Sequence, residues 1–303
     1  MTVLAAIPLA VLLLAGPAGA QPAGRGAGPQ DLPFPAEELI RKVAFAQRRV
    51  DRSLTDYTFD QVEVRTSWGK GGRQKETRRR LFHYFSGERP GEATRELVEV
   101  DGRPATPEER RDQAEEDAKQ RRRDVERRAG ADASRPPAVS GEEEDPLVGP
   151  RRLSDLVARF DYRLDGAVEE DGRLLYALAF SPKPGLPAGS LGDRALNALA
   201  GRVLVDASDF QIVSVEARLV RPVKVSGGIA ANVKEATISY RGSRLPHGVW
   251  FPCVIDLHLR GKTAVFFNLD TSFRFEFSGF ASFSVETDSD VGGPDAASVQ
   301  SAR

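Results

Sequence analysis

The chain has 303 residues, a formal net charge of −1 and a single cysteine, Cys253. The nearly neutral charge provides no basic field for nucleic acid, so we expect no nucleic-acid partner. One cysteine excludes an intramolecular disulfide, and a chain of this length can bury a core large enough to fold without one.

The amino-terminal residues have the pattern of an export signal. An apolar stretch from Val3 to Leu14 is followed by the small residues Ala18-Gly19-Ala20, which are typical of a cleavage site. No Lys or Arg precedes the stretch, which a mis-assigned start codon or a weak signal would explain. An uncleaved membrane anchor is the alternative. We predict a cleaved signal peptide over residues 1–20 and a flexible leader, rich in Gly, Pro and Ala, over residues 21–34.

An amphipathic helix is predicted directly after this leader. Pro35 at an early helical position and two acidic residues, Glu37 and Glu38, in the first turn mark its start. Apolar residues then recur at helical spacing, at Leu39, Val43, Ala46, Val50 and Leu54. These positions predict a helix over residues 35–54 whose apolar stripe can pack on a sheet.

Alternation of apolar and polar residues predicts strands through most of the remaining chain. It is clearest in Val249–Leu259 and Phe267–Phe277, where the odd positions are mostly large and apolar. Turns such as Asp101-Gly102 and Asp171-Gly172 join most of these strands closely, which favours antiparallel pairing. We therefore expect an α+β fold: a strongly curved antiparallel sheet of about eight to eleven strands, with the 35–54 helix on its concave face.

One strand changes its phase. Between Asp56 and Ser67 the apolar positions shift from odd (Tyr57, Phe59) to even (Val62, Val64). A β-bulge near Asp60 accounts for this shift.

A charged insertion interrupts the strand pattern over residues 104–150. Its first part, Thr106–Arg128, begins with a capping box formed by Thr106 and Glu109 and contains almost no apolar residues. Such a helix has no face to bury, so it is expected to project into solvent, and Gly130–Pro150 is expected to be a disordered linker. The alternative is that the 106–128 helix docks an envelope protein partner.

Two segments carry a resemblance to a known superfamily. The hairpin Gly201–Ala217, with its Asp206-Ala207-Ser208-Asp209 turn, and the segment Leu245–Pro252 followed by two long strands resemble the outer-membrane lipoprotein-sorting (LolA/LolB-like) proteins. The resemblance covers residues 35–100 and 153–284. It implies an unclosed β-barrel that curls round helices, with a hydrophobic cavity for acyl chains, in an exported periplasmic carrier of lipid or lipoprotein.

This resemblance and the strand patterns lead to a domain organisation. Residues 35–284 are expected to form a single half-barrel domain, interrupted by the 104–150 insertion, and residues 285–303 a disordered tail. The charged insertion departs from the compact carriers of the superfamily, and no cysteine is available for a lipid anchor after the signal.

The apolar strand positions predict where a ligand would lie. We expect a cavity between the last two strands and the 35–54 helix, gated by the Pro-rich segment and small helix of residues 181–200 through Leu186 and Leu196. The expected lining residues are Leu39, Val43, Val50, Val213, Val215, Leu219, Phe251, Ile255, Leu257, Phe273, Phe275 and Phe277. The alternative is that the three last phenylalanines fill the space themselves.

Enzyme chemistry finds no support in the sequence. The three histidines, His83, His247 and His258, are scattered, and Cys253 falls on a predicted apolar face, where cysteine is usually a small core residue. We therefore predict neither catalysis nor a metal or other cofactor. Besides a carrier, a sensor domain of the same fold and a structural envelope protein without a ligand remain open as functions.

Overall fold

The computed structural model describes residues 35–53, 57–85, 94–132, 157, 159–186, 191–225, 231–245, 248–263 and 267–282. The predicted signal peptide, the leader, residues 133–150 of the predicted 130–150 linker and the 285–303 tail lie outside these residues, as do Leu54 and His247. The first three residues of that predicted linker, 130–132, are instead helical. No helix of the described part is long and apolar enough to cross a membrane.

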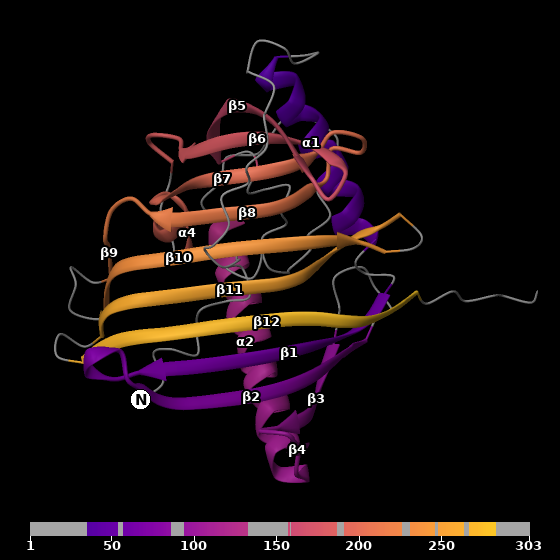
Figure 1. Ribbon diagram of the computed structural model, residues 1–303. Helices are drawn as coiled ribbons and strands as arrows, with labels where there is room; N and C mark the ends of the chain where they lie inside the picture. The colour runs from indigo at the N-terminus through magenta and orange to yellow at the C-terminus, as the bar shows by residue number, and fades with distance from the viewer. Residues whose placement is uncertain are drawn as a thin grey trace, which may run out of the picture.

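The described strands form one large antiparallel sheet that does not close on itself (Figure 1). They are β1 (Tyr57–Trp68), β2 (Gln74–Phe85), β3 (Thr94–Val100), β4 (Arg103–Pro104), β5 (Phe160–Glu170), β6 (Arg173–Pro182), β7 (Leu199–Asp206), β8 (Ile212–Leu219), β9 (Val223–Val225), β10 (Ala231–Arg244), β11 (Trp250–Thr263) and β12 (Phe267–Ser282). Their order is β4-β3-β2-β1-β12-β11-β10-β8-β7-β6-β5, and β9 pairs with β10. The predicted fold class is thus confirmed.

The sheet has 12 strands within the described residues, one more than the upper end of the sequence prediction. The difference comes from β4 and β9, which have two and three residues and are too short to show alternation. The β1–β2 hairpin lies beside β12, so the first and last long strands meet in the middle of the sheet.

Helix α1 (Ala36–Ser53) forms where the caps and the apolar spacing predict it. Leu39 and Val43 are buried in the main core. A polar latch holds the second half of the helix, because buried Gln47 Nε2 donates to Gln211 Oε1 over 2.8 Å and Gln211 Nε2 donates to the Ala46 carbonyl over 3.2 Å. The helix is therefore tied to the turn between β7 and β8 as well as packed on the sheet.

Two apolar clusters cover different parts of the same concave face. The larger one joins α1 to β5–β8, β10 and β11, and includes Val215, Ile255 and Leu257. The smaller one lies on β2 and β3 around the fully buried Phe82, with Leu97 beside it. Figure 1 shows α1 and α2 (Pro107–Asp132) behind the sheet in that view, on opposite parts of it.

The irregularity expected near Asp60 is present in the pairing of β1 with β12, where the register shifts between Thr58 and Asp60. Its extra residue lies in β12, where Gly279 has a φ of +66°. Towards β2, by contrast, β1 pairs without a shift from Phe59 to Ser67. The inward positions of β1 are therefore Gln61, Glu63 and Arg65, and the concave face becomes polar there, which the sequence reading did not anticipate.

Helix α2 also differs from the expectation of a free arm. Its capping box is formed, since Glu109 N donates to Thr106 Oγ1 and Thr106 N donates to Glu109 Oε2. However, its first half docks on β2 and β3 through a bidentate pair between Arg95 and Asp117, with donor–acceptor distances of 2.6 and 2.9 Å. The prediction that the whole helix projects into solvent is therefore wrong, because polar side chains provide the docking face in place of apolar ones.

Candidate ligand-binding face

The concave face of the sheet has an apolar part and a polar part that meet where β1 pairs with β12. On β12, Phe273, Phe275 and Phe277 are half-buried at the edge of the main core. Directly opposite them on β1 lie the inward polar residues, because the register pairs Arg65 with Phe273, Glu63 with Phe275 and Gln61 with Phe277. A row of aromatic rings thus runs alongside a row of polar side chains.

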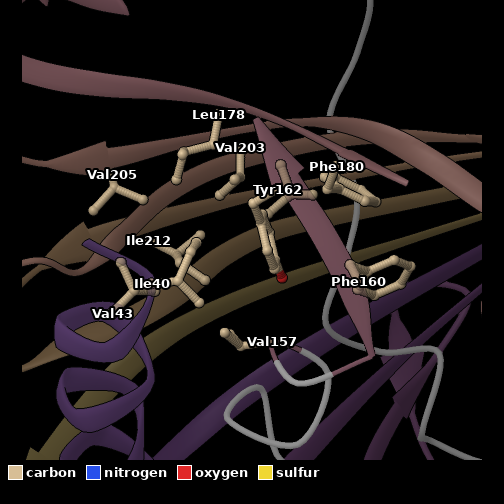
Figure 2. A pocket seen from close by; sticks show the side chains of 11 residues that line it. Ile40, Val43, Val157, Phe160, Tyr162, Leu178, Phe180, Val203, Val205 and Ile212 are labelled. Atoms are coloured by element: carbon tan, nitrogen blue, oxygen red, sulfur yellow. The ribbon is translucent and has the colours of Figure 1, made fainter. Parts of the chain in front are cut away.

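A small apolar cavity lies between α1 and strands β5–β8 (Figure 2). Its volume is about 30 Å³, room for no more than a few water molecules. It is lined by Ile40, Val43, Val157, Phe160, Tyr162, Leu178, Phe180, Val203, Val205, Ile212 and Val215. Figure 2 shows the ring of Tyr162 reaching from β5 into the space beside α1, and burial raises the pKa of Tyr162, so its hydroxyl stays neutral.

This position differs from the predicted one, which placed the cavity against the last two strands. The predicted lining residues Val43 and Val215 reach the cavity. Leu39, Ile255 and Leu257 are buried in the core around it, and Leu219 packs against that core. The cavity lies elsewhere because the curved sheet brings β5 and β6 close to α1, an effect of curvature that the alternation pattern of β11 and β12 does not contain.

Three other predicted lining residues lie apart from the cavity. Val50 lies in a surface groove of about 700 Å³ between α1 and Trp250. Val213 falls at a register shift between β7 and β8, so its neighbour Ile212 faces the cavity. Phe251 is fully buried but contacts the rings of Tyr57 and Phe280, with centroids 4.8 and 4.4 Å away.

The polar part of the face is a network of paired charges between the sheet and α2. Arg80 Nη2 donates to Glu63 Oε1, and Arg80 Nη1 donates to Gln113 Oε1 of α2 over 2.8 Å. Arg95 pairs with Asp117, donates to the Tyr84 hydroxyl and lies over the ring of Phe82 at 4.3 Å. Burial lowers the pKa of Arg95, but the hydrogen bonds to Asp117 and Tyr84 and the attraction of these two groups together outweigh it, so this pKa is raised above its ordinary value.

The two predicted gate residues, Leu186 and Leu196, lie in segments that contact each other. Leu196 ends the short helix α4 (Leu191–Leu196) and is buried in the main core. Leu186 is half-buried, and its carbonyl accepts a hydrogen bond of 3.0 Å from Asn197 Nδ2. Helix α4 is earlier than the predicted 193–200 helix, because β7 already begins at Leu199 and accounts for its last residues.

The residues considered for catalysis are placed on the outer face or in ordinary surroundings. His83 Nδ1 lies 2.6 Å from Asp60 Oδ1, and His258 Nε2 lies 2.7 Å from Asp270 Oδ1. Both histidine side chains are partly exposed. Cys253 is half-buried, and burial raises the pKa of its thiol, which lowers its nucleophilic fraction. The described residues contain no group of three His, Cys, Asp or Glu side chains that could hold a metal ion.

Comparison with known proteins gives distant similarity to solved structures. No protein-family model and no curated protein matches the chain. A DUF1329 family protein from Desulfovibrio piger is 15% identical, with 86% of this chain and 95% of that chain covered and a TM-score of 0.37. A domain from Vibrio parahaemolyticus described as an outer membrane lipoprotein-sorting protein is 10% identical, with 82% and 93% covered and a TM-score of 0.37.

A LolA superfamily protein from Nitrosomonas europaea is 11% identical, with 83% of this chain and 95% of that chain covered and a TM-score of 0.33. The unclosed antiparallel sheet that the sequence resemblance implied is the architecture of this chain.

Proposed function

We propose that this chain is an exported periplasmic carrier that holds the acyl chains of a lipid or lipoprotein on the concave face of its sheet. The observation that carries the proposal is the half-buried row of Phe273, Phe275 and Phe277. Full burial of an exposed large apolar side chain gains about 1.5–3 kcal/mol, so covering these half-buried rings gains roughly half of that for each. An acyl chain laid on this row completes that burial.

The dimensions of the apolar face suit one acyl chain. A row across the sheet runs from Phe273 through Leu257 and Ile238 to Ala217, as the strand registers show. Three strand spacings span about 14 Å. One leaflet of a bilayer, half of a hydrocarbon core of about 30 Å, is of the same depth.

Loading requires movement of the present cover. Leu257 and Ile238 are already buried beneath the cluster that contains α1 and Leu196, and the existing cavity of about 30 Å³ is too small for an acyl chain. The 181–200 segment is the proposed gate, since Leu196 is the part of the cover that α4 contributes. The polar latch between Gln47 and Gln211 keeps α1 in place while this gate opens.

Binding of a fluorescent fatty acid to delipidated protein tests the proposal. We expect saturable binding that Phe275→Ala weakens, because this ring is half-buried on the concave face. The matched change Phe85→Ala, at an exposed ring on β2, should leave binding unchanged. Absence of saturable binding to the wild-type chain would favour the alternative of a structural protein with a filled core, which the small cavity volume supports.

Export is tested separately by the mass of the mature protein in its native host. We expect the mature chain to begin at Gln21, after the Ala18-Gly19-Ala20 site. A mature chain that still carries residues 1–20 would instead support the uncleaved anchor.

Docking of an envelope protein partner on α2 is a further proposal, for which the outward charged side chains Glu108, Arg111 and Glu115 offer a surface.

A further inference from the structure

Two hydrogen-bond donors on the concave side of β1 have no acceptor among the described residues. Gln61 is 1% exposed, and its Nε2 has no hydrogen-bond partner. Nε of Arg65, two inward positions further along the same strand, is also buried without a partner. Buried donors are almost always satisfied in folded proteins, so these two groups require an explanation.

The charge of Arg65 is not balanced by a carboxylate of the described residues. Its one contact of note is with the ring of Phe273, whose centroid lies 5.8 Å from the guanidinium carbon. Glu63, which lies between the two unpartnered donors, is already bonded to Arg80. Asp117 is likewise occupied by Arg95.

The other described charges on this part of the face leave Arg65 without an opposite charge. The strand registers and the α2 contacts place Arg65, Arg78, Arg80, Arg95, Glu63, Glu76 and Asp117 on the concave side. Glu63 and Asp117 are paired with Arg80 and Arg95, and the cation nearest the aromatic row, Arg65, has no carboxylate partner among the described residues. The polar row offers donors and positive charge, and its one acid is satisfied.

These donors are in direct register with the apolar face. Arg65 lies opposite Phe273 and Gln61 lies opposite Phe277, so each donor is one strand spacing, about 4.8 Å, from the aromatic row. A molecule that covers the phenylalanines and reaches β1 therefore brings its polar end to Gln61 and Arg65. Such a molecule must carry acceptors, and a negative charge is favoured at Arg65.

We propose, resting on the function proposed above, that the ligand is an anionic acyl phospholipid whose phosphate binds Arg65. Its ester carbonyl accepts from Gln61 Nε2, and its acyl chain covers Phe273, Phe275 and Phe277. A neutral acylglycerol supplies the chain and the carbonyl but leaves the charge of Arg65 unpaired. The phosphate therefore selects among acyl ligands.

A matched pair of ligands tests this selection on the full chain after delipidation. 1-Palmitoyl lysophosphatidic acid and monopalmitoylglycerol differ only in the phosphate, and both are titrated below their aggregation concentrations. We expect the wild-type protein to bind the lysophosphatidic acid about tenfold more tightly, the effect of one charge-assisted hydrogen bond. Arg65→Gln should bring the ratio of the two Kd values to about one, with the Kd of monopalmitoylglycerol unchanged.

Three controls make each result decisive. Arg218→Gln removes a cation from the outward face of β8 and should preserve the full preference. Arg65→Lys keeps the charge and should retain part of it. If Arg65→Gln does not fold, the preference of the wild-type protein for lysophosphatidic acid is measured between about 0.05 M and about 0.5 M NaCl. This preference should fall with salt, because salt screens the partly exposed pair of Arg65 and the phosphate.

The unfavourable outcomes are separable from one another. Equal Kd values for the two wild-type complexes, or a full preference in Arg65→Gln, would overturn the phosphate site while leaving acyl-chain binding intact. Inorganic phosphate that displaces the lysophosphatidic acid at equal concentration would show a free-phosphate site and overturn the lipid assignment. If neither palmitoyl ligand binds saturably, the carrier function itself fails.

Discussion

The docking of α2 on the sheet gives the sharpest test of how polar contacts stabilise this fold. Asp117→Asn keeps the shape of the side chain but removes the charge that neutralises Arg95. The two side chains are 13% and 21% exposed, with N–O distances of 2.6 and 2.9 Å, so the pair lies between a surface pair and a buried one. Loss of one partner of a buried pair costs 3–5 kcal/mol, whereas surface pairs contribute about 0–1 kcal/mol.

We expect Asp117→Asn to lower the free energy of unfolding by about 2 kcal/mol. This value lies between those of a surface pair and a buried pair, because Arg95 keeps two other contacts, the Tyr84 hydroxyl at 3.3 Å and the ring of Phe82 at 4.3 Å. Urea titration followed by circular dichroism measures the change. Hydrogen exchange should in addition show faster opening of residues 107–119 than of β11, because α2 undocks before the sheet unfolds.

Glu115→Gln on the same helix is the control for this prediction. The Glu115–Lys119 pair has an N–O distance of 4.0 Å and side chains that are 62% and 58% exposed, so its loss should cost at most about 0.5 kcal/mol. If Asp117→Asn shifts the unfolding midpoint no more than Glu115→Gln does, the docking of α2 through Asp117 contributes no stability and the reasoning is refuted.

Three further predictions concern packing, pH and the gate. Gly201→Ala places a Cβ 1.9 Å from a backbone oxygen of β8, so we expect a loss of more than about 1 kcal/mol in urea unfolding; an unchanged midpoint would contradict it. Hydrogen bonds from Arg103 lower the pKa of Glu109 from 4.5 to about 2. This carboxylate therefore stabilises the fold fully above about pH 4.5, and the stabilisation is lost as the pH falls through about 2. An NMR titration of the Glu109 carboxyl should show a midpoint at this low pH and not near 4.5. Leu196→Glu should impair both stability and fatty-acid uptake, whereas Leu174→Glu, at an exposed site, should affect neither. If the two substitutions have equal effects on fatty-acid uptake, the gate is contradicted.

Local patterns were enough to predict the elements that depend on neighbouring residues. The limits of α1 follow from Pro35 and the 3–4 residue spacing of its apolar side chains, and the α2 capping box needs only Thr106 and Glu109. The turns at Asp101-Gly102 and Asp171-Gly172 form with positive φ at both residues, as that dipeptide favours. In each case the determining contacts lie within one or a few turns of chain.

The features that were missed depend on contacts between distant segments. Asp117 and Arg95 are two ordinary charges in the sequence, and only the packing of α2 against β3 makes them partners. The cavity at β5–β8 depends on sheet curvature, which alternation alone does not specify. The polar row of β1 does not follow from a β-bulge near Asp60, because such a bulge would keep Val62 and Val64 on the same face as Tyr57 and Phe59.

A signal for that polar row was nevertheless present in the sequence. If Tyr57 and Phe59 face inward, strict alternation places Gln61, Glu63 and Arg65 inward as well, and no bulge in β1 is needed. Burying polar side chains on an inner face is costly unless they find partners, so such a row indicates either a network or a ligand. In this fold Glu63 belongs to a network with Arg80, while Gln61 and Arg65 retain unpartnered donors.

The position of this row in the topology has a consequence for binding. The pairing of Arg65 with Phe273 joins segments 208 residues apart, which come together only when β1 docks beside β12. The apolar row and the donor row are therefore a single surface only in the folded chain, and a ligand that spans both binds the native state alone. Such a ligand raises the free energy of unfolding by RT ln(1 + [L]/Kd), so we expect the proposed lipid to stabilise the pairing of β1 with β12.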